Sequence, residues 1–137
     1  MDIVHHVFNE IDILALAGDY FQTIDYCIKG TTLFYLDPPY KPISKTSSFT
    51  AYSKGTFDDK EQERLKMFCD ELTNRGCYFI LSNSDLKNYD KSNHYFDNLY
   101  SDYKIKRVKA KRVINSKAEK RGEINELLIT NFDKLSN

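Results

Sequence analysis

An α/β fold, with a mixed sheet that ends in an antiparallel hairpin, is predicted for this chain of 137 residues. Three observations lead to this prediction. Residues 31 to 36 form a β-branched, aromatic and apolar run, which favours a strand packed on both faces. Residues 58 to 76 carry apolar side chains at helical spacing, and a second apolar run follows over residues 77 to 81. Residues 103 to 109 alternate with basic side chains, and residues 126 to 132 supply the apolar return strand of a β-hairpin.

The N-terminal region is predicted to hold two short elements before the first strand. Residues 11 to 17 read as a short strand or the end of a helix, closed by Gly18. Asp19 then stands where a helix over residues 20 to 29 would be capped, and Gly30 is its expected stop. As a plain helix cap, Asp19 would need no ligand.

The segment Asp37-Pro38-Pro39-Tyr40, directly after the first strand, is the most informative in the chain. Proline has no N–H, fixes φ and pushes the preceding residue out of the α region. We therefore expect Asp37 and Pro38 to be extended, with the Asp37 carboxylate and the main-chain carbonyls facing outward. Ligands of open α/β sheets bind at the carboxyl ends of the strands. The residues alone also allow a tight turn that closes the strand and leaves Tyr40 as a surface aromatic.

Two acceptors in this position suit the alkylation of an amino group on a planar base. Such an amine is a poor nucleophile because its lone pair is delocalised into the ring. The Asp37 carboxylate and the Pro38 carbonyl would each accept an N–H and turn the lone pair toward an electrophile. The carboxylate would also stabilise the positive charge that develops on the nitrogen. Tyr40 would stack on a base that has left the duplex.

The next segment, residues 41 to 57, is rich in Ser, Thr and Lys with interspersed aromatic residues. One interpretation is a segment that closes over an extruded base, with lysines near phosphates and an aromatic ring as a wall of the pocket. The other is a mobile surface loop whose aromatic side chains dock on the core. Both interpretations stay open for each residue of the segment.

A core helix is predicted after this segment. Phe57 would staple its start, and Asp58 or Asp59 would cap it. One apolar face, expected to lie in the core, recurs until Gly76 and consists of Leu65, Phe68, Cys69 and Leu72.

A buried strand over residues 77 to 81 follows the helix. Residues 82 to 85 are predicted to end it in a polar turn on the ligand side of the sheet. Asn83 in this turn is either a pocket residue or a residue that serves the turn itself.

The last third of the chain is predicted to form a basic hairpin. The chain as a whole carries no net charge, but residues 104 to 121 hold nine basic side chains and one acid, Glu119. One basic strip on an otherwise acidic protein is the electrostatic footprint of a nucleic-acid face. The alternative is a solvated hairpin whose lysines keep an edge strand from pairing with other chains. The basic residues are Lys104, Lys106, Arg107, Lys109, Lys111, Arg112, Lys117, Lys120 and Arg121.

The composition argues against several classes of protein. Apolar residues make up 41% and aromatic residues 14% of the chain, which favours a folded rather than a disordered protein. No apolar run is long enough for a membrane span, and residues 1 to 6 form no signal peptide. The cysteines Cys27, Cys69 and Cys77 lack paired spacing, so neither a disulfide nor structural zinc is expected, and a reducing cytoplasm is inferred. No metal site is expected at His5, His6 or His94.

Four motifs in order resemble those of the Dam-like DNA adenine-N6 methyltransferases, over about residues 12 to 132. Asp37-Pro38-Pro39-Tyr40 is similar to the catalytic motif of amino-group methyltransferases that use S-adenosylmethionine. Residues 41 to 52 resemble the loop that follows this motif, and residues 79 to 85 resemble the next core strand. Residues 112 to 132 resemble the C-terminal hairpin of that family.

The resemblance implies a fold, an activity and a set of site residues. The fold would be part of a Rossmann-like methyltransferase sheet, and the activity would be methyl transfer from S-adenosylmethionine to N6 of a flipped adenine in double-stranded DNA. Asp37, Pro38, Pro39 and Tyr40 would be catalytic, and Asp19, Tyr20 and Asp37 would contact the methyl donor. DNA contacts would come from Lys41, Lys45, Phe49, Tyr52, Arg112, Asn115, Ser116, Lys117 and Arg121. Because a similar motif serves methyltransferases of RNA and of protein amides, those substrates remain alternatives.

The resemblance also indicates two parts of the family's domain that this sequence does not show, a Gly-rich turn and a target-recognition region. The family holds the methionine end of the donor on a Gly-rich turn, whereas the five glycines of this chain are far apart. A target-recognition region is expected before Asp37, where thirty-six residues stand. We therefore expect residues 1 to 137 to be one domain, the C-terminal part of a methyltransferase catalytic domain. Its partners would be DNA and either a missing N-terminal half or a second copy. The alternative function is that of a truncated remnant or split-enzyme half that acts through binding alone.

Overall fold

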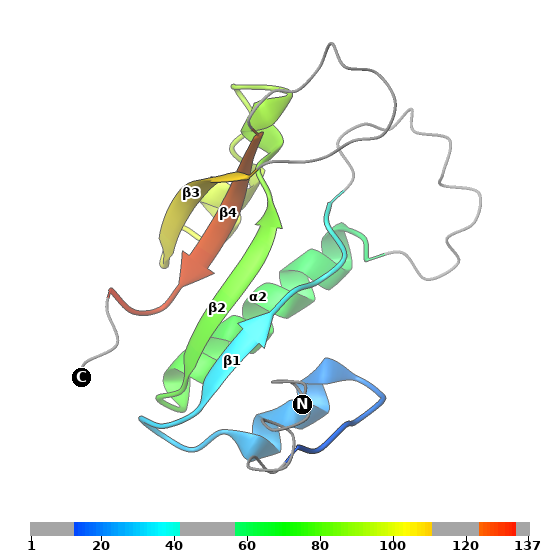
Figure 1. Ribbon diagram of the computed structural model, residues 1–137, viewed down its shortest axis with the longest axis vertical. Coiled ribbons are helices and arrows are strands. Elements are labelled where there is room, and N and C mark those ends of the chain that lie inside the picture. Colours follow the sequence, from blue (N-terminus) through cyan, green and yellow to red (C-terminus); the bar gives the residue numbers. More distant parts are fainter. Residues whose placement is uncertain (1–12, 42–56, 111–123, 134–137) are drawn as a thin grey trace, which may run out of the picture.

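The computed structural model describes residues 13–41, 57–110 and 124–133, which form a mixed α/β fold (Figure 1). The long helix and the four strands form the body of the molecule, and the other helices are short. In chain order the elements are η1 (Tyr20–Tyr26), β1 (Leu33–Leu36), α2 (Asp59–Asn74), β2 (Tyr78–Ser84), η3 (Leu86–Asn88), α3 (Tyr95–Leu99), β3 (Lys104–Ala110) and β4 (Ile124–Thr130).

The four strands form one mixed sheet in the order β1-β2-β4-β3. β1 runs parallel to β2, with Leu36 opposite Leu81. β4 runs antiparallel to both of its neighbours, so β3 and β4 form the hairpin at one edge of the sheet. The predictions of a mixed sheet and of a closing antiparallel hairpin are confirmed.

Helix α2 begins where the sequence predicts it. The Asp58 carboxylate accepts a hydrogen bond from the Glu61 N–H at 3.0 Å, which satisfies one of the free donors of the first turn. Its predicted apolar face is buried and packs on the sheet, and Gln62 lies buried on the same face. Gly76 follows with a φ of 74°, a left-handed conformation that ends the helix.

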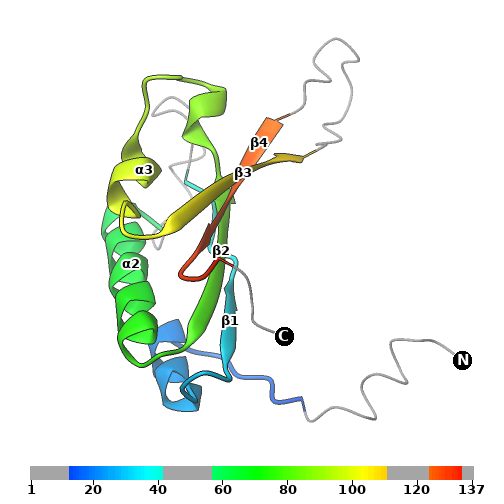
Figure 2. The same cartoon turned by 90° about the vertical axis from the view of Figure 1, so that its left-hand side faces the viewer.

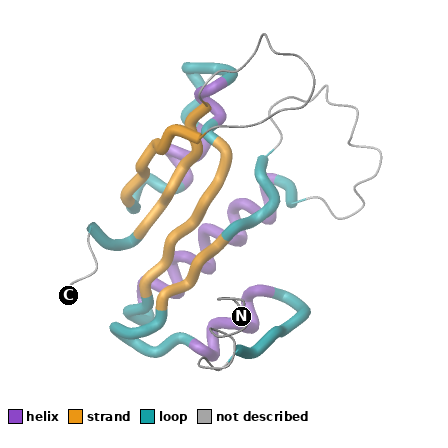
Figure 3. The backbone as a smooth tube through the Cα atoms, viewed as in Figure 1, coloured by secondary structure: helices purple, strands orange, loops and turns teal. Residues whose placement is uncertain are grey.

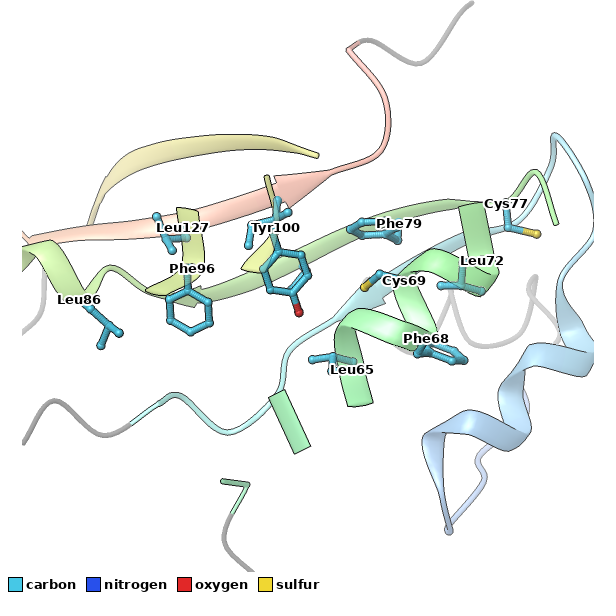
Figure 4. Packing of buried hydrophobic residues seen from close by; sticks show 12 residues of the cluster. Leu65, Phe68, Cys69, Leu72, Cys77, Phe79, Leu86, Phe96, Tyr100 and Leu127 are labelled. Carbon is cyan, nitrogen blue, oxygen red and sulfur yellow. The ribbon is translucent and has the colours of Figure 1, made fainter. Parts of the chain in front are cut away.

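The hydrophobic core lies between the sheet and the helices α2 and α3, which cover the same face (Figure 2). Phe68 of α2 is fully buried and packs edge-on against the rings of Tyr20, Phe21 and Phe34. These contacts join η1 and β1 to the helix. Figure 4 shows Cys69 of α2 facing Phe79 of β2, and Phe96 of α3 facing Leu127 of β4, across this layer.

The opposite face of the sheet is open along β1, so the prediction of a strand packed on both faces is wrong. Leu33 is 43% exposed and Tyr35 is 65% exposed, whereas Phe34 and Leu36 point to the core. The apolar run could not reveal this difference, because burial of a strand's second face depends on another layer. Among the described residues, no helix lies on that side (Figure 2).

Two predictions for the N-terminal region are also corrected. Residues 13–17 form neither strand nor helix, and Ile13, Leu14 and Leu16 are each more than half exposed. Apolar residues without a neighbouring strand or helix to pack on have nothing to stabilise regular structure. The helix expected over residues 20 to 29 is the shorter 3-10 helix η1, because the backbone is extended at Cys27.

The cysteines and the end of β2 differ from expectation as well. Cys27 and Cys77 form a disulfide, so the prediction of no disulfide is wrong for this pair. They stand 50 residues apart, and only the packing of η1 beside the start of β2 brings them together. Cys69 is free and buried, and burial raises the pKa of its thiol to about 12. Residues 82 to 84 continue β2 rather than forming a turn, because they pair with β4.

We predict that Phe68→Ala destabilises the protein by about 3–5 kcal/mol, because it opens a cavity among three aromatic rings. Urea denaturation followed by circular dichroism would measure the loss. The matched control is Met67→Ala, since Met67 is 64% exposed on the same helix and should change stability by less than about 0.5 kcal/mol. Equal effects of the two substitutions would contradict this account of the core.

Candidate active site

The predicted catalytic segment begins at the end of the sheet where the parallel strands β1 and β2 both terminate, called here the carboxyl edge. Since Leu36 lies opposite Leu81, the next residues along the two strands, Asp37 and Ser82, lie side by side. Residues 37–41 then leave the sheet as a loop, the Asp37–Lys41 segment (Figure 3). The carboxyl edge is where α/β sheets bind ligands.

The Asp37 side chain is exposed, and a hydrogen bond from a buried residue of β2 fixes its carboxylate. Ser82 is only 6% exposed, and its hydroxyl donates to Oδ1 of Asp37 at 2.8 Å. No described residue donates a hydrogen bond to Oδ2. Through Oδ1, Ser82 therefore orients the carboxylate of an exposed residue.

The rest of the predicted catalytic motif lines the same loop. Pro38 and Tyr40 are half-buried and Pro39 is exposed. The two prolines remove two backbone donors from the neighbourhood of the carboxylate. This arrangement is compatible with the predicted roles of the three residues, which stay predictions.

The backbone of Lys41 is tied to the end of β2. Its N–H donates to Oδ1 of Asn83 at 3.4 Å, and its carbonyl accepts from the Ser84 hydroxyl at 3.4 Å. Asn83 is fully buried and also donates to Gln62 of α2 at 3.4 Å. The loop is thus attached to both the sheet and the helix.

The side chain of Lys41, a predicted DNA contact, points to α2. Its ammonium forms an ion pair with Asp59 and lies 4.3 Å from the centre of the Tyr95 ring. Partial burial lowers the pKa of Lys41. A phosphate would have to compete with Asp59 for this charge, and the DNA contact stays a prediction.

Asp19 and Tyr20, the predicted donor contacts, lie on the other side of the first half of α2. The Asp19 carboxylate accepts from the Phe21 N–H at 2.9 Å and from Arg64 at 2.7 Å. These hydrogen bonds hold the pKa of Asp19 below its ordinary value. The Tyr20 ring packs edge-on against Phe68 and under the Arg64 guanidinium, and burial raises its pKa. Asp19 is therefore a helix cap with an ion-pair partner, and a ligand contact stays a prediction.

Helix α2 is the element that both candidate segments share. Arg64 binds the segment that carries Asp19, while Asp59 and Gln62 bind the Asp37–Lys41 segment directly or through Asn83. Their anchoring residues lie within two turns of the helix. Sequence reasoning assigned no role to Arg64, and it placed Ser82 only in a polar turn on the ligand side of the sheet. A charged residue next to the predicted core face was the only signal for Arg64.

Most of the predicted DNA contacts lie outside the described residues, namely Lys45, Phe49, Tyr52, Arg112, Asn115, Ser116, Lys117 and Arg121. The described residues at which these segments begin and end show which edge of the sheet the segments adjoin. Residues 42–56 follow Lys41, and residues 111–123 join Ala110 to Ile124. Because Ser84 pairs with Glu126 and Ala110 pairs with Ile124, all these points lie toward the carboxyl edge.

The described part of the basic strip is partly neutralised. Arg107 binds Asp85 and Asp97 at 2.9 Å, and the acid Asp85 is almost fully buried. Lys104 forms an ion pair with Asp133, whereas Lys106 is exposed. Two of the four basic side chains of residues 104–110 are thus paired with acids, while residues 111–121 carry five further basic side chains and Glu119.

Three further findings in the described ranges concern metal sites, membrane-spanning helices and surface hollows. They contain no group of three or more His, Cys, Asp and Glu side chains that could hold a metal ion. None of their helices is long and apolar enough to cross a membrane. A shallow surface hollow beside α2 is lined by Phe21, Lys60, Glu63, Arg64 and Met67, none of which belongs to the carboxyl edge.

Comparison with known proteins decides the family of the chain. The family model of the D12 class N6 adenine-specific DNA methyltransferases matches residues 2–114. This chain belongs to that family. The Type II methyltransferase M.MjaIII of Methanocaldococcus jannaschii is 45% identical over 122 residues, which cover 88% of this chain and 40% of the relative.

Two further relatives of the D12-class chain support the assignment. The Type II methyltransferase M1.LlaDCHI of Lactococcus lactis subsp. cremoris is 31% identical over 96% of this chain and 44% of its own length. The DNA adenine methylase of Escherichia coli K12 is 32% identical over 71% of this chain and 32% of its own length. The chain thus spans less than half the length of the relatives that it matches.

The ion pair of Asp19 predicts a pH dependence of stability. Since its pKa in the folded chain lies below the ordinary value of 3.8, Asp19 stabilises the fold above that pH. The contribution is lost as the pH falls through the lower, folded value. We predict that wild type exceeds Arg64→Met in urea midpoint near neutral pH, and that this difference shrinks below pH 3.8. Because Arg64 also lies 3.7 Å from Glu61, the control background carries both Asp19→Asn and Glu61→Gln, and the effect of Arg64→Met should not vary with pH there. A pH dependence that is the same in the Glu61→Gln and the doubly substituted backgrounds would refute the pairing with Asp19.

Proposed function

We propose that this chain is the part of a DNA adenine methyltransferase that binds and activates the target amine. In the proposed reaction, N6 of an adenine flipped out of double-stranded DNA receives a methyl group from S-adenosylmethionine. The observation that carries the proposal is the exposed, Ser82-oriented carboxylate of Asp37 at the carboxyl edge of a D12-class chain.

The proposed chemistry acts on the amine. Asp37, through Oδ2, and the Pro38 carbonyl each accept one N–H of the adenine amino group. The nitrogen lone pair then turns out of conjugation with the ring and toward the methyl group. As the N–C bond forms, the bond from the methyl carbon to the sulfonium sulfur would break, S-adenosylhomocysteine would leave, and the nitrogen would then lose a proton. A carboxylate already in place would stabilise the positive charge that develops on nitrogen more in the transition state than in the ground state. Tyr40 stacks on the flipped base.

The described residues fit the amine side of this reaction better than the donor side. S-adenosylmethionine, when bound, supplies an activated methyl group. The Asp37 carboxylate would accept an N–H of the amine, but both oxygens of Asp19 already accept hydrogen bonds and Tyr20 is packed on Phe68. We therefore propose that Asp19 and Tyr20 contact the donor only through their exposed edges. Residues beyond those described would complete the donor site.

The proposal has two finer parts, a role in restriction and modification and a partial Rossmann-like sheet. Relatives named Type II methyltransferases support a role in restriction and modification. The order of the four strands supports a partial Rossmann-like sheet that needs further strands beyond β1. The segments 42–56 and 111–123 would carry the DNA contacts near the carboxyl edge.

A second candidate function is that of a split-enzyme half or a remnant, which binds DNA or a partner without methylating alone. The exposed Leu33 and Tyr35 on the open face of the sheet favour it. Methyl incorporation from labelled S-adenosylmethionine into unmethylated DNA separates the candidates. A folded chain that binds DNA and transfers no methyl group would favour the second.

For the enzyme, we predict that Asp37→Ala lowers the single-turnover rate of methylation about 100- to 1000-fold, because the developing charge loses its carboxylate. Binding to unmethylated DNA, measured by fluorescence anisotropy, should stay nearly unchanged. Asp25→Ala is the matched control, since it removes an exposed carboxylate from η1. Full activity of Asp37→Ala would sink the mechanism.

We also predict a strong salt dependence of DNA binding, because lysine and arginine contacts to phosphates release counterions. Lys117→Ala should reduce the slope of log affinity against log salt concentration by about one. The control is Lys29→Ala, an exposed lysine near the opposite end of the sheet. A slope that is the same in wild type and Lys117→Ala would remove this residue from the DNA face.

A further inference from the structure

Three consecutive side chains at the carboxyl end of β2 hydrogen-bond the Asp37–Lys41 segment at both of its ends. Ser82 donates to the Asp37 carboxylate at 2.8 Å, Asn83 accepts from the Lys41 N–H at 3.4 Å, and Ser84 donates to the Lys41 carbonyl at 3.4 Å. We propose that these residues form a cradle that holds the segment. Within it, Ser82 is a positioning residue for Asp37. The inference rests on the proposed function and extends it to residues that never touch the substrate.

The cradle replaces a sheet ladder that prolines prevent. β1 pairs with β2 only as far as Leu36 and Leu81, while β2 continues to Ser84 because it also pairs with β4. Beyond Leu36, Pro38 and Pro39 have no N–H to donate to a neighbouring strand. The loop therefore lacks regular backbone hydrogen bonds in this stretch, and side chains of the longer strand supply its attachment instead.

The burial of the cradle supports this role. Ser82 is 6% exposed, Asn83 0% and Ser84 8%, although all three are polar. Polar side chains are costly in such positions unless they are hydrogen-bonded, and apolar residues would pack there more easily. Their partners are the loop, α2 and the backbone of β2 itself. Much of their hydrogen-bonding capacity is thus used to hold the Asp37–Lys41 segment.

The chemical type of the Ser82 contact also fits. A neutral hydroxyl orients the carboxylate through Oδ1 without cancelling its negative charge. A lysine or arginine in its place would neutralise the charge that the proposed reaction needs. Because no described residue donates to Oδ2, the oriented carboxylate keeps one oxygen for the amine.

The test compares wild type with Ser82→Ala, Ser82→Thr and the control Ser101→Ala, an exposed serine after α3. The first readout needs no activity: three-bond NMR couplings to Cγ of Asp37 report its χ1 rotamers. We expect one dominant rotamer in wild type, Ser82→Thr and Ser101→Ala, and averaged couplings in Ser82→Ala. Should Ser82→Ala not fold, Ser82→Cys retains the side-chain size with a weak donor and should show the same averaging.

The second readout is single-turnover methylation at saturating DNA and S-adenosylmethionine. Ser82→Ala should lose about 10- to 100-fold in rate through a misplaced carboxylate, with unchanged DNA affinity and with activity restored in Ser82→Thr. Unchanged couplings in Ser82→Ala overturn the inference, and so does an unchanged rate. If wild type transfers no methyl group while the couplings still average in Ser82→Ala, the positioning by Ser82 stands and the proposed function fails for this chain.

Discussion

The parallel pairing of β1 with β2 is the constraint on which the candidate site depends. It places Asp37 beside Ser82 and aligns the ends of both strands at one edge of the sheet. Parallel neighbours require a crossover connection, and here α2 provides the packed part of it. The pairing therefore holds only while the buried face of α2 stays on the sheet, with Phe68 at its centre. The chemistry proposed for Asp37 is in this sense a consequence of hydrophobic packing.

Polar residues on the same helix then join the site to the core. Asp59 pairs with Lys41, Gln62 meets Asn83, and Arg64 binds Asp19. A helix whose apolar face is fixed on a sheet presents its flanking residues at set positions, because they share its rigid backbone. Two loops distant in sequence are thereby held against one element. This arrangement explains how the irregular segments that carry Asp19 and Lys41 are both attached to one helix.

Helices cover one face of the sheet, and no described helix covers the other. Its helix-covered face is a well-filled core, whereas Leu33 and Tyr35 leave the opposite face of β1 apolar and exposed. Parallel sheets are commonly covered on both faces. Leu33 and Tyr35 thus mark the part of the sheet that no described helix covers (Figure 2).

Local features of this protein could be read from the sequence by itself. Asp58 as the cap of α2, the buried face of that helix, the hairpin and the family motif around Asp37 all depend on neighbours within a few residues or on pattern. The tertiary structure alone decided the contacts between distant segments, because no local preference encodes them. It extended β2 through Ser84, joined Cys27 to Cys77, left one face of β1 open and brought Ser82 to the carboxylate of Asp37.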